Sequence, residues 1–553
     1  MAIASPSAPN FSASPSFRCS RTDAPCFAPF PFVSHPRPSF ARRFFISSRL
    51  NASIFSGAGA GFGSPDNGDV QYELQHGFSL ERRKRGSAVF VTLPIDAVSP
   101  AGEVRRRKAM SQSFRALAAA GVEGVVIEVW WGFVERDEPC SYNWKGYLEI
   151  VALARRYGLK VRAVFSFSQN GIGPDDPHWI PLPKWVLEEI NKDPDLAYSD
   201  RFGRRNAEYI TLGCDTLPVL LGRSPVQAYA DFMRNFRDIF RPYLGAIVTG
   251  IQVGMGPAGE LRYPSSPLQK LTGARRSHEL GEFQCYDKYM LASLNACAQD
   301  VGMREWGNGG PTGASNLMNN PEQTEFFRGE NGSWNTPYGE FYLKWYSEML
   351  LLHGERLCKE AETIFRGIEV NLSAKLGGIH WHYGTKSHPS ELTAGYYNTS
   401  IRDGYLPIAR MLGRYSFTMC CSCFEMQDFE EKQMNPVGSP EGFLRQLLIA
   451  ARVCDIPLEG ENSVMGLDNN SFQQAVKMSR VYSDGLEKLS FSFNFVRMDK
   501  NMFEYGNWVR FTRFVRQMSD TSNLFRAKLN PGSNRNLSSA SDITTSRLAL
   551  AYH

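Results

Sequence analysis

Acidic side chains recur in this sequence directly after short apolar segments. Asp96, Glu128, Glu260, Glu425 and Glu461 each end or closely follow a run of β-branched and apolar residues of strand length. Two carboxyl groups that converge from such positions can act as a general acid and a general base, because their surroundings can keep one protonated and the other ionised. The pattern indicates acid–base chemistry, although any one of these residues taken alone could equally be structural.

Basic groups and aromatic rings accompany these carboxylates. Lys375 and His380 follow a further apolar segment, and Arg497 ends the last one. Tryptophan and tyrosine residues occur in the same regions, at Trp130, Trp131, Trp179, Trp185, Tyr263, Trp381 and Tyr383. Aromatic side chains offer a flat apolar face, and polar groups beside them can bind hydroxyls. The combination favours a carbohydrate cleft, although much of this aromatic set could also belong to the core.

The elements that must position these groups alternate between strands and helices. Strand-length segments occur at 88–95, 124–131, 159–168, 246–254, 369–376, 416–424, 456–460 and 489–497. Helical patterns lie between them at 105–120, 147–157, 225–240, 337–361 and 442–452. Eight such units predict an α/β fold, a closed (β/α)8 (TIM) barrel. The long connections 169–245 and 255–368, after the third and fourth strands, are expected on its ligand-binding face.

Six motifs in order carry a resemblance to a known family. They are VIEVWWG (126–132), GPAGELRYP (256–264), GEFQCYDKY (281–289), GGIHWHY (377–383), ELTAGYYN (391–398) and LEGENS (458–463). From about residue 88 to 515 the sequence resembles the plant β-amylases. The resemblance implies a starch-acting barrel that releases maltose from non-reducing ends of α-1,4-glucan with inversion. It implies Glu260 as general acid and Glu461 as general base, with carboxyl groups about 6.5–9.5 Å apart to admit a water.

The resemblance also implies which residues contact the sugar. These expected substrate-binding residues are Asp96, Glu128, Ser168, Asp176, Lys375, His380, Ser422, Asn462 and Arg497. No cofactor is implied. No metal is predicted either, because Cys420, Cys421, Cys423 and Cys454 lack the spacing of a zinc site and fit small buried barrel residues.

The sequence departs from the family in the loop after the third strand. Where active members carry HQCGGNVGD, residues 168–176 read SQNGIGPDD. Ser168 replaces the histidine, Ile172 replaces a hinge glycine, and Pro174 fixes φ and removes an N–H donor. Closure of such a loop excludes water and completes the site, so these changes predict impaired turnover.

Further departures surround the two glutamates. Glu128 replaces an aspartate, Gln252 a carboxylate, Ser422 a threonine, Gln427 an arginine and Ser266 a tyrosine. Two functions therefore remain open. The favoured one is an inactive or very weak plastid protein that binds α-glucan and regulates starch degradation, with other starch-degrading enzymes as candidate partners. The alternative is an active β-amylase, and a third possibility is altered specificity for a short oligosaccharide.

The ends of the chain differ in composition from its body. Residues 1–50 hold ten Ser, eight Pro, six Arg and one Asp, and so carry the whole formal net charge of +5. This composition predicts a chloroplast transit peptide. We expect a flexible linker at 51–86, the barrel domain at 87–530 and a disordered tail at 531–553. Because the body is electrically balanced and has no long apolar run, neither nucleic acid nor a membrane is an expected partner.

Overall fold

The computed structural model describes residues 86–171, 173–265, 280–314, 321–463, 466–483 and 491–520. The predicted transit peptide, nearly all of the predicted linker and the predicted C-terminal tail lie outside these residues. The expected boundaries of these segments therefore stay predictions.

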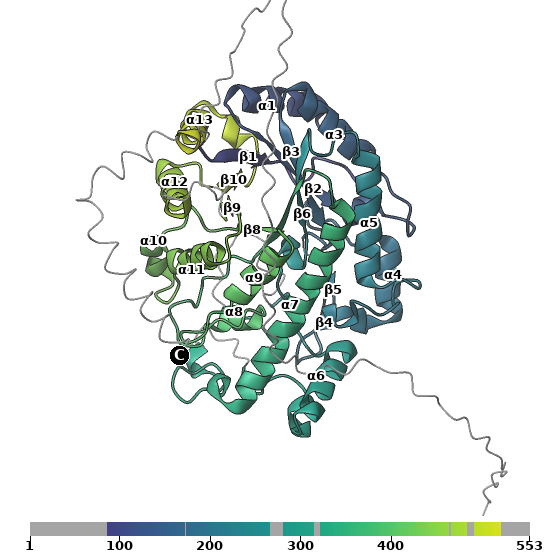
Figure 1. Cartoon of the computed structure of the whole chain (residues 1–553), viewed down its shortest axis with the longest axis vertical. Coiled ribbons are helices and arrows are strands. Elements are labelled where there is room, and N and C mark those ends of the chain that lie inside the picture. The colour runs from purple at the N-terminus through teal and green to yellow at the C-terminus, as the bar shows by residue number, and fades with distance from the viewer. Residues whose placement is uncertain are drawn as a thin grey trace, which may run out of the picture. The chain divides into compact units, whose positions relative to one another are not determined.

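Eight parallel strands close into a barrel (Figure 1) in the order β1-β10-β9-β8-β7-β6-β3-β2. Their bounds are β1 (Ala88–Thr92), β2 (Gly124–Trp130), β3 (Lys160–Ser166), β6 (Val248–Val253), β7 (Asn371–Lys375), β8 (Thr418–Cys421), β9 (Leu458–Glu461) and β10 (Phe491–Phe495). Each falls within or beside a predicted segment, and the (β/α)8 prediction is confirmed. The predicted segments are mostly longer, because apolar residues continue past the last ladder hydrogen bond into the loops.

Helices surround the strands (Figure 1). Five occur where the sequence predicts them, namely α1 (Arg107–Ala119), α3 (Lys145–Arg156), α5 (Pro225–Phe240), α7 (Pro337–Phe365) and α11 (Pro440–Val453). The ring is completed by α9 (Leu406–Arg414), α12 (Asn469–Ser483) and α13 (Tyr505–Ser519). Shorter or inserted helices are α2 (Trp131–Val134), α4 (Lys184–Lys192), α6 (Lys288–Asp300), α8 (Pro389–Thr393) and α10 (Asp428–Met434).

The insertion after β3 contains a two-stranded antiparallel hairpin that the sequence patterns do not reveal. Its strands are β4 (Ala197–Ser199) and β5 (Arg205–Ile210). The Asp200 carboxylate accepts from the N–H groups of Phe202 and Arg204 at 2.9 and 3.0 Å, and Gly203 takes a positive φ of 74°. An aspartate followed by a glycine three residues later was the available turn signal. The hairpin brings Glu208 to the site described below.

Side chains alternate between the two sides of the barrel wall. Val89 and Val91 of β1 pack in the main core, whereas Phe90 of the same strand contacts Arg162 across the interior. A period of two follows from the pleat of a strand. The same alternation places the last inward residue of each strand at the C-terminal mouth of the barrel.

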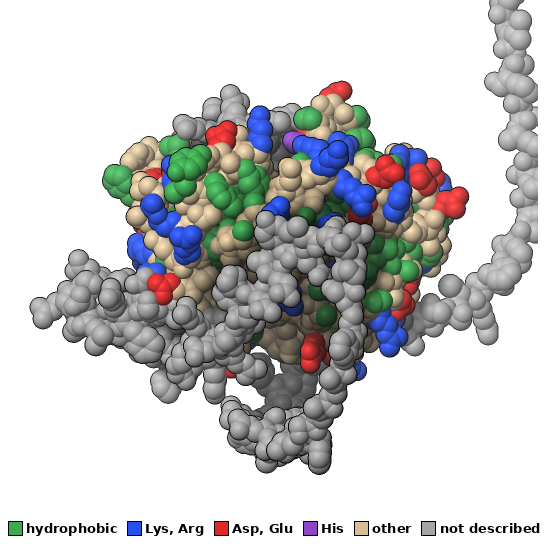
Figure 2. All heavy atoms as spheres, turned by 90° about the horizontal axis from the view of Figure 1, so that it is seen from above, with side chains coloured by type: hydrophobic (Ala, Val, Ile, Leu, Met, Phe, Trp, Pro, Cys, Tyr) green, Lys and Arg blue, Asp and Glu red, His purple; other side chains and the backbone are tan. Residues whose placement is uncertain are grey.

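The surface carries mixed side chains. Figure 2 shows cationic, anionic and apolar groups interspersed on one face. Within the described ranges, no helix combines the length and apolar character needed to cross a lipid bilayer.

Candidate active site

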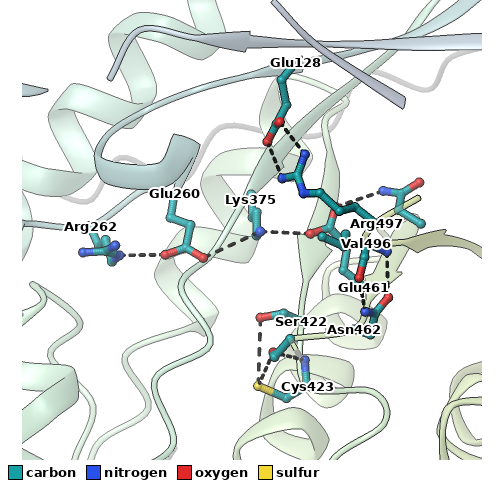
Figure 3. A network of polar contacts seen from close by, with 12 residues as sticks. Glu128, Glu260, Arg262, Lys375, Ser422, Cys423, Glu461, Asn462, Val496 and Arg497 are labelled. Atoms are coloured by element: carbon teal, nitrogen blue, oxygen red, sulfur yellow. Dashed lines mark hydrogen bonds and ion pairs between the residues drawn. The ribbon is translucent and has the colours of Figure 1, made fainter. Parts of the chain in front are cut away.

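Glu260 and Glu461 lie on either side of a single lysine (Figure 3). Lys375 Nζ is 2.9 Å from Glu461 Oε2 and 3.7 Å from Glu260 Oε1. The lysine ends β7, Glu461 ends β9, and Glu260 follows β6. The two carboxylate oxygens that face the ammonium group can therefore be no farther apart than the sum of these distances. This upper limit only just reaches the range of about 6.5–9.5 Å expected for inverting hydrolysis, so the two oxygens that face the lysine are no farther apart than the shortest separations in that range.

Glu461 is suited to the role of a base. Its side chain is buried, and burial alone would raise its pKa. The charge and hydrogen bond of Lys375, with hydrogen bonds from Asn494 and Cys420, outweigh burial and lower the pKa of Glu461 below its ordinary value. The carboxylate is thus held ionised at neutral pH, which is the form that can accept a proton from water.

Glu260 is positioned by hydrogen bonds to its own loop. Leu261 N–H donates to Lys375 O at 2.8 Å, so the loop adds to the edge of β7. The Tyr396 hydroxyl accepts from Gly377 N–H and donates to Leu261 O, both at 2.8 Å. Arg262 Nε donates to Glu260 Oε2 at 2.7 Å. One tyrosine therefore ties the segment of the expected acid to the segment that follows Lys375.

A third carboxylate, Glu208 of β5, supports this loop and was missed in the sequence. The Ala258 N–H donates to it, and Ala258 has a positive φ of 54°, a conformation that costs energy for a residue with a Cβ. Burial raises the pKa of Glu208. The positive charge of Arg262 lowers this pKa and the negative charge of Glu260 raises it, and the net shift is upward. Because Glu208 belongs to the unpredicted hairpin, no strand-end pattern marks it.

Glu128 and Arg497, both expected to bind substrate, are paired with each other (Figure 3). Arg497 donates from Nη1 to Glu128 Oε2 at 2.8 Å and from Nη2 to Glu128 Oε1 at 3.1 Å. Such a two-point contact is geometrically specific. Asp96 lies at the rim, where its carboxylate accepts from Arg106 Nη2 at 2.6 Å. A sugar hydroxyl would have to compete with these pairs.

The loop after β3 is hydrogen-bonded to itself. Asn170 and Ile180 exchange backbone hydrogen bonds of 2.9 and 2.8 Å, and Asn170 Nδ2 donates to His178 O at 2.6 Å. Asp176 accepts from His178 N–H at 2.9 Å and lies beside Gly171. Ile172 lies outside the described residues. The Asp176 carboxylate thus accepts a hydrogen bond from its own loop.

His380, Ser422 and Asn462 lie on the same side of the mouth as β8 and β9. Burial disfavours the His380 imidazolium, but contacts with Cys423 and Glu431 outweigh it and raise the pKa of His380 to about 10. Ser422 is buried and adjoins Cys423. Asn462 Oδ1 accepts from Val496 N–H at 2.8 Å, and its amide also donates to Val496 O, so it connects the ends of β9 and β10 (Figure 3).

Several polar atoms at the strand ends are buried without a hydrogen-bond partner among the described residues. They are Thr92 Oγ1, Trp130 Nε1 and Ser168 Oγ. Leaving such a group unsatisfied costs about 1–3 kcal/mol, so native proteins rarely do so without a reason. In the part of the chain that the structure describes, no cluster of His, Cys, Asp and Glu could hold a metal ion.

A (β/α)8 barrel with two carboxylates flanking a lysine at its C-terminal mouth defines a glycosidase-type protein. Residues 90–523 match the model of glycosyl hydrolase family 14. The chain belongs to this family, the β-amylases.

Relatives and a solved structure agree with this assignment. The chain is 51% identical over 447 residues to β-amylase 1, chloroplastic, of Arabidopsis thaliana, covering 80% of this chain and 77% of that one. It is also 51% identical over 441 residues to β-amylase 1, chloroplastic, of Oryza sativa subsp. japonica, covering 79% and 82%. These names confirm the predicted chloroplast localisation.

The fold matches the catalytic domain of β-amylase from Paenibacillus polymyxa with a TM-score of 0.64. That structure is 22% identical, with 78% of this chain and 98% of the other covered.

Proposed function

We propose that this β-amylase-family protein binds α-1,4-glucan at the barrel mouth with little or no hydrolysis, and that it acts as a regulator of starch degradation in the plastid. The observation that carries the proposal is Ser168, which is 3% exposed and has an unpartnered hydroxyl at the end of β3. The family resemblance places a histidine there, next to the loop that closes over substrate. A serine cannot reach as far or titrate near neutral pH.

Retention of ligand binding is supported by the polar atoms left without partners at the strand ends. They lie at or just beyond the C-terminal ends of β1, β2 and β3, at the same end of the barrel as Lys375. A glucan chain supplies many hydroxyl groups, each able to donate and accept. Binding therefore survives in this proposal even where the loop no longer completes the site for turnover.

The alternative, an active exo-hydrolase that releases maltose, is favoured by the Glu260–Lys375–Glu461 arrangement. Maltose release from soluble starch separates the two functions, with Glu260→Gln as the control. We expect release by the natural protein to equal that of the control, while maltoheptaose still binds in a calorimetric titration. Release clearly above the control would establish the alternative, and absence of both release and binding would exclude both functions.

Trp130→Phe is expected to weaken maltoheptaose binding about fivefold. The change keeps an aromatic ring in the apolar contact with Phe133 and Ile180 but removes the unpartnered Nε1–H. A net hydrogen bond contributes roughly 0.5–1.5 kcal/mol, which corresponds to this factor. Isothermal titration measures the change. As a matched control, Trp185→Phe removes an indole N–H that already donates to Glu135 O at 3.0 Å and is therefore not available to a ligand, so affinity should stay unchanged.

A further inference from the structure

One carboxylate oxygen of Glu461, Oε2, faces Lys375, and the other, Oε1, contacts a side chain in the barrel interior. Asn494 Nδ2 donates to Glu461 Oε1 at 3.1 Å. The same amide accepts, through Oδ1, a hydrogen bond of 2.7 Å from Arg162 Nη1. Asn494 lies on β10 and is 1% exposed, and Arg162 comes from β3. A continuous chain of two hydrogen bonds thus links a guanidinium group deep in the barrel to the expected base.

The arginine determines which way the asparagine amide points. A guanidinium group can only donate, and an ionised carboxylate can only accept. With Arg162 on one side, the carbonyl oxygen of Asn494 must face it, and the NH2 group must face Glu461. Without Arg162 the amide could rotate and present oxygen to the Glu461 carboxylate, which would repel it.

Arg162 is held in place by the N-terminal half of the barrel interior. Its Nη2 donates to Ser492 Oγ at 2.8 Å, its Nη1 lies 3.5 Å from Glu459 Oε1, and the guanidinium stacks 3.7 Å over the Phe90 ring. Gly250 leaves space for it, since a Cβ there would lie 3.0 Å from Arg162 Cγ.

The surroundings of Arg162 are separate from the glucan mouth. A cavity of about 690 Å³ adjoins Arg162 and Glu459 and is lined by the first residues of the strands, among them Ala88, Asn371, Thr418, Leu458 and Phe491. These residues lie at the opposite end of the barrel from the mouth. Replacing Arg162 therefore removes no group that would contact the glucan in the proposed function.

We propose that Arg162 and Asn494 are positioning residues for Glu461, which fix its carboxylate from the N-terminal side of the barrel. The inference deepens the proposed function, because it rests on Glu461 belonging to the glucan site. Neither residue touches the ligand in this proposal. Arg162 acts only through Asn494, and Asn494 acts only on the orientation and charge of Glu461.

The test is a carbon-13 NMR titration of the full chain labelled at its glutamate carboxyl carbons, with the Glu461 signal assigned by its loss in Glu461→Gln. We expect Arg162→Met to raise the titration midpoint of Glu461 by about one pH unit, because the hydrogen bond from Asn494 that favours the ionised carboxylate is weakened when its amide can rotate. Asn494→Leu should give a similar upward shift. Arg162→Lys, which retains a donor-only cation, should restore most of the natural value.

Two further variants separate positioning from loss of folding. Ser492→Ala removes the other hydrogen bond of Arg162 but leaves its contact with Asn494, so the Glu461 midpoint should stay unchanged. Arg162→Met/Glu459→Gln avoids an unpaired buried carboxylate and should show the same shift as Arg162→Met in a stably folded chain. An unchanged Glu461 midpoint in this double variant overturns the proposal.

Maltoheptaose binding is measured on the same samples. If the natural protein binds no glucan, the proposed function fails, but the titration of Glu461 still decides the role of Arg162.

Discussion

Lys375→Met is expected to destabilise the protein by about 3 kcal/mol at neutral pH, the lower end of the cost of removing one partner from a buried ion pair, because Glu461 is buried but Lys375 is 20% exposed. Lys375 Nζ is the cation nearest Glu461, at 2.9 Å, and also lies 3.7 Å from Glu260. Methionine fills a similar volume, so packing changes little. The free energy of unfolding from urea titrations at pH 7.5 measures the loss.

The pH dependence of this loss has a definite sign. In the natural protein the pKa of Glu461 is lowered from 4.5, so its pairing stabilises the fold at pH values above 4.5 and is lost as pH falls through the folded-state value. Without Lys375, burial dominates and raises the pKa of Glu461 above 4.5. The variant then gains stability relative to the unfolded chain as pH falls and Glu461 takes up a proton.

The difference in unfolding free energy between Lys375→Met and the natural protein should therefore be smaller at pH 5.5 than at pH 7.5. Lys375→Met/Glu461→Gln provides the matched control, since it removes the unpaired charge and should recover most of the stability at pH 7.5. A deficit that is equal at both pH values, and that the double variant does not relieve, would mean that Lys375 stabilises the barrel through packing alone.

The eight strands could be predicted because their sequence signal is local. Runs such as GVVIEVW are apolar and β-branched, and the polar residue that follows each run marks its C-terminal end. The barrel then brings those ends together. More than one hundred residues separate Glu260 from Lys375, and more than eighty separate Lys375 from Glu461. The barrel topology alone nevertheless predicts that all three share one mouth.

Other parts of the site depend on contacts that no local pattern records. Glu208 is recruited by a hairpin with strands of three and six residues inside an insertion, too short to give a clear periodicity. Arg162 and Asn494 occupy inward positions in the middle of strands, where an apolar residue is the ordinary expectation. Their pairing becomes visible only when β3 and β10 face each other across the barrel. Likewise, the sequence identifies Glu128 and Arg497 as polar strand-end residues but does not reveal that they pair.

Maltose release from soluble starch is expected to rise by about 10²-fold when the family's loop residues are restored. The triple variant combines Ser168→His, Ile172→Gly and Pro174→Val. The factor is typical of correcting a misplacement of about 1 Å in a catalytic site. The expectation rests on the intact pair of Glu260 and Glu461 and on the lowered pKa of Glu461. A histidine at the end of β3 would fill the position where Ser168 has no partner. Glycine at 172 and valine at 174 would return the backbone freedom and the N–H donor that the present residues lack.

The controls determine which part of the loop is responsible. Ser168→Ala removes the hydroxyl without adding an imidazole and should leave release at the level of the natural protein. Adding Glu260→Gln to the restored triple variant should abolish any gain, because the proton donor is then missing. If the triple variant releases no more maltose than the natural protein, the loop is not what limits turnover. The Glu128–Arg497 pair, with contacts of 2.8 and 3.1 Å, then becomes the next site to change, beginning with Glu128→Asp.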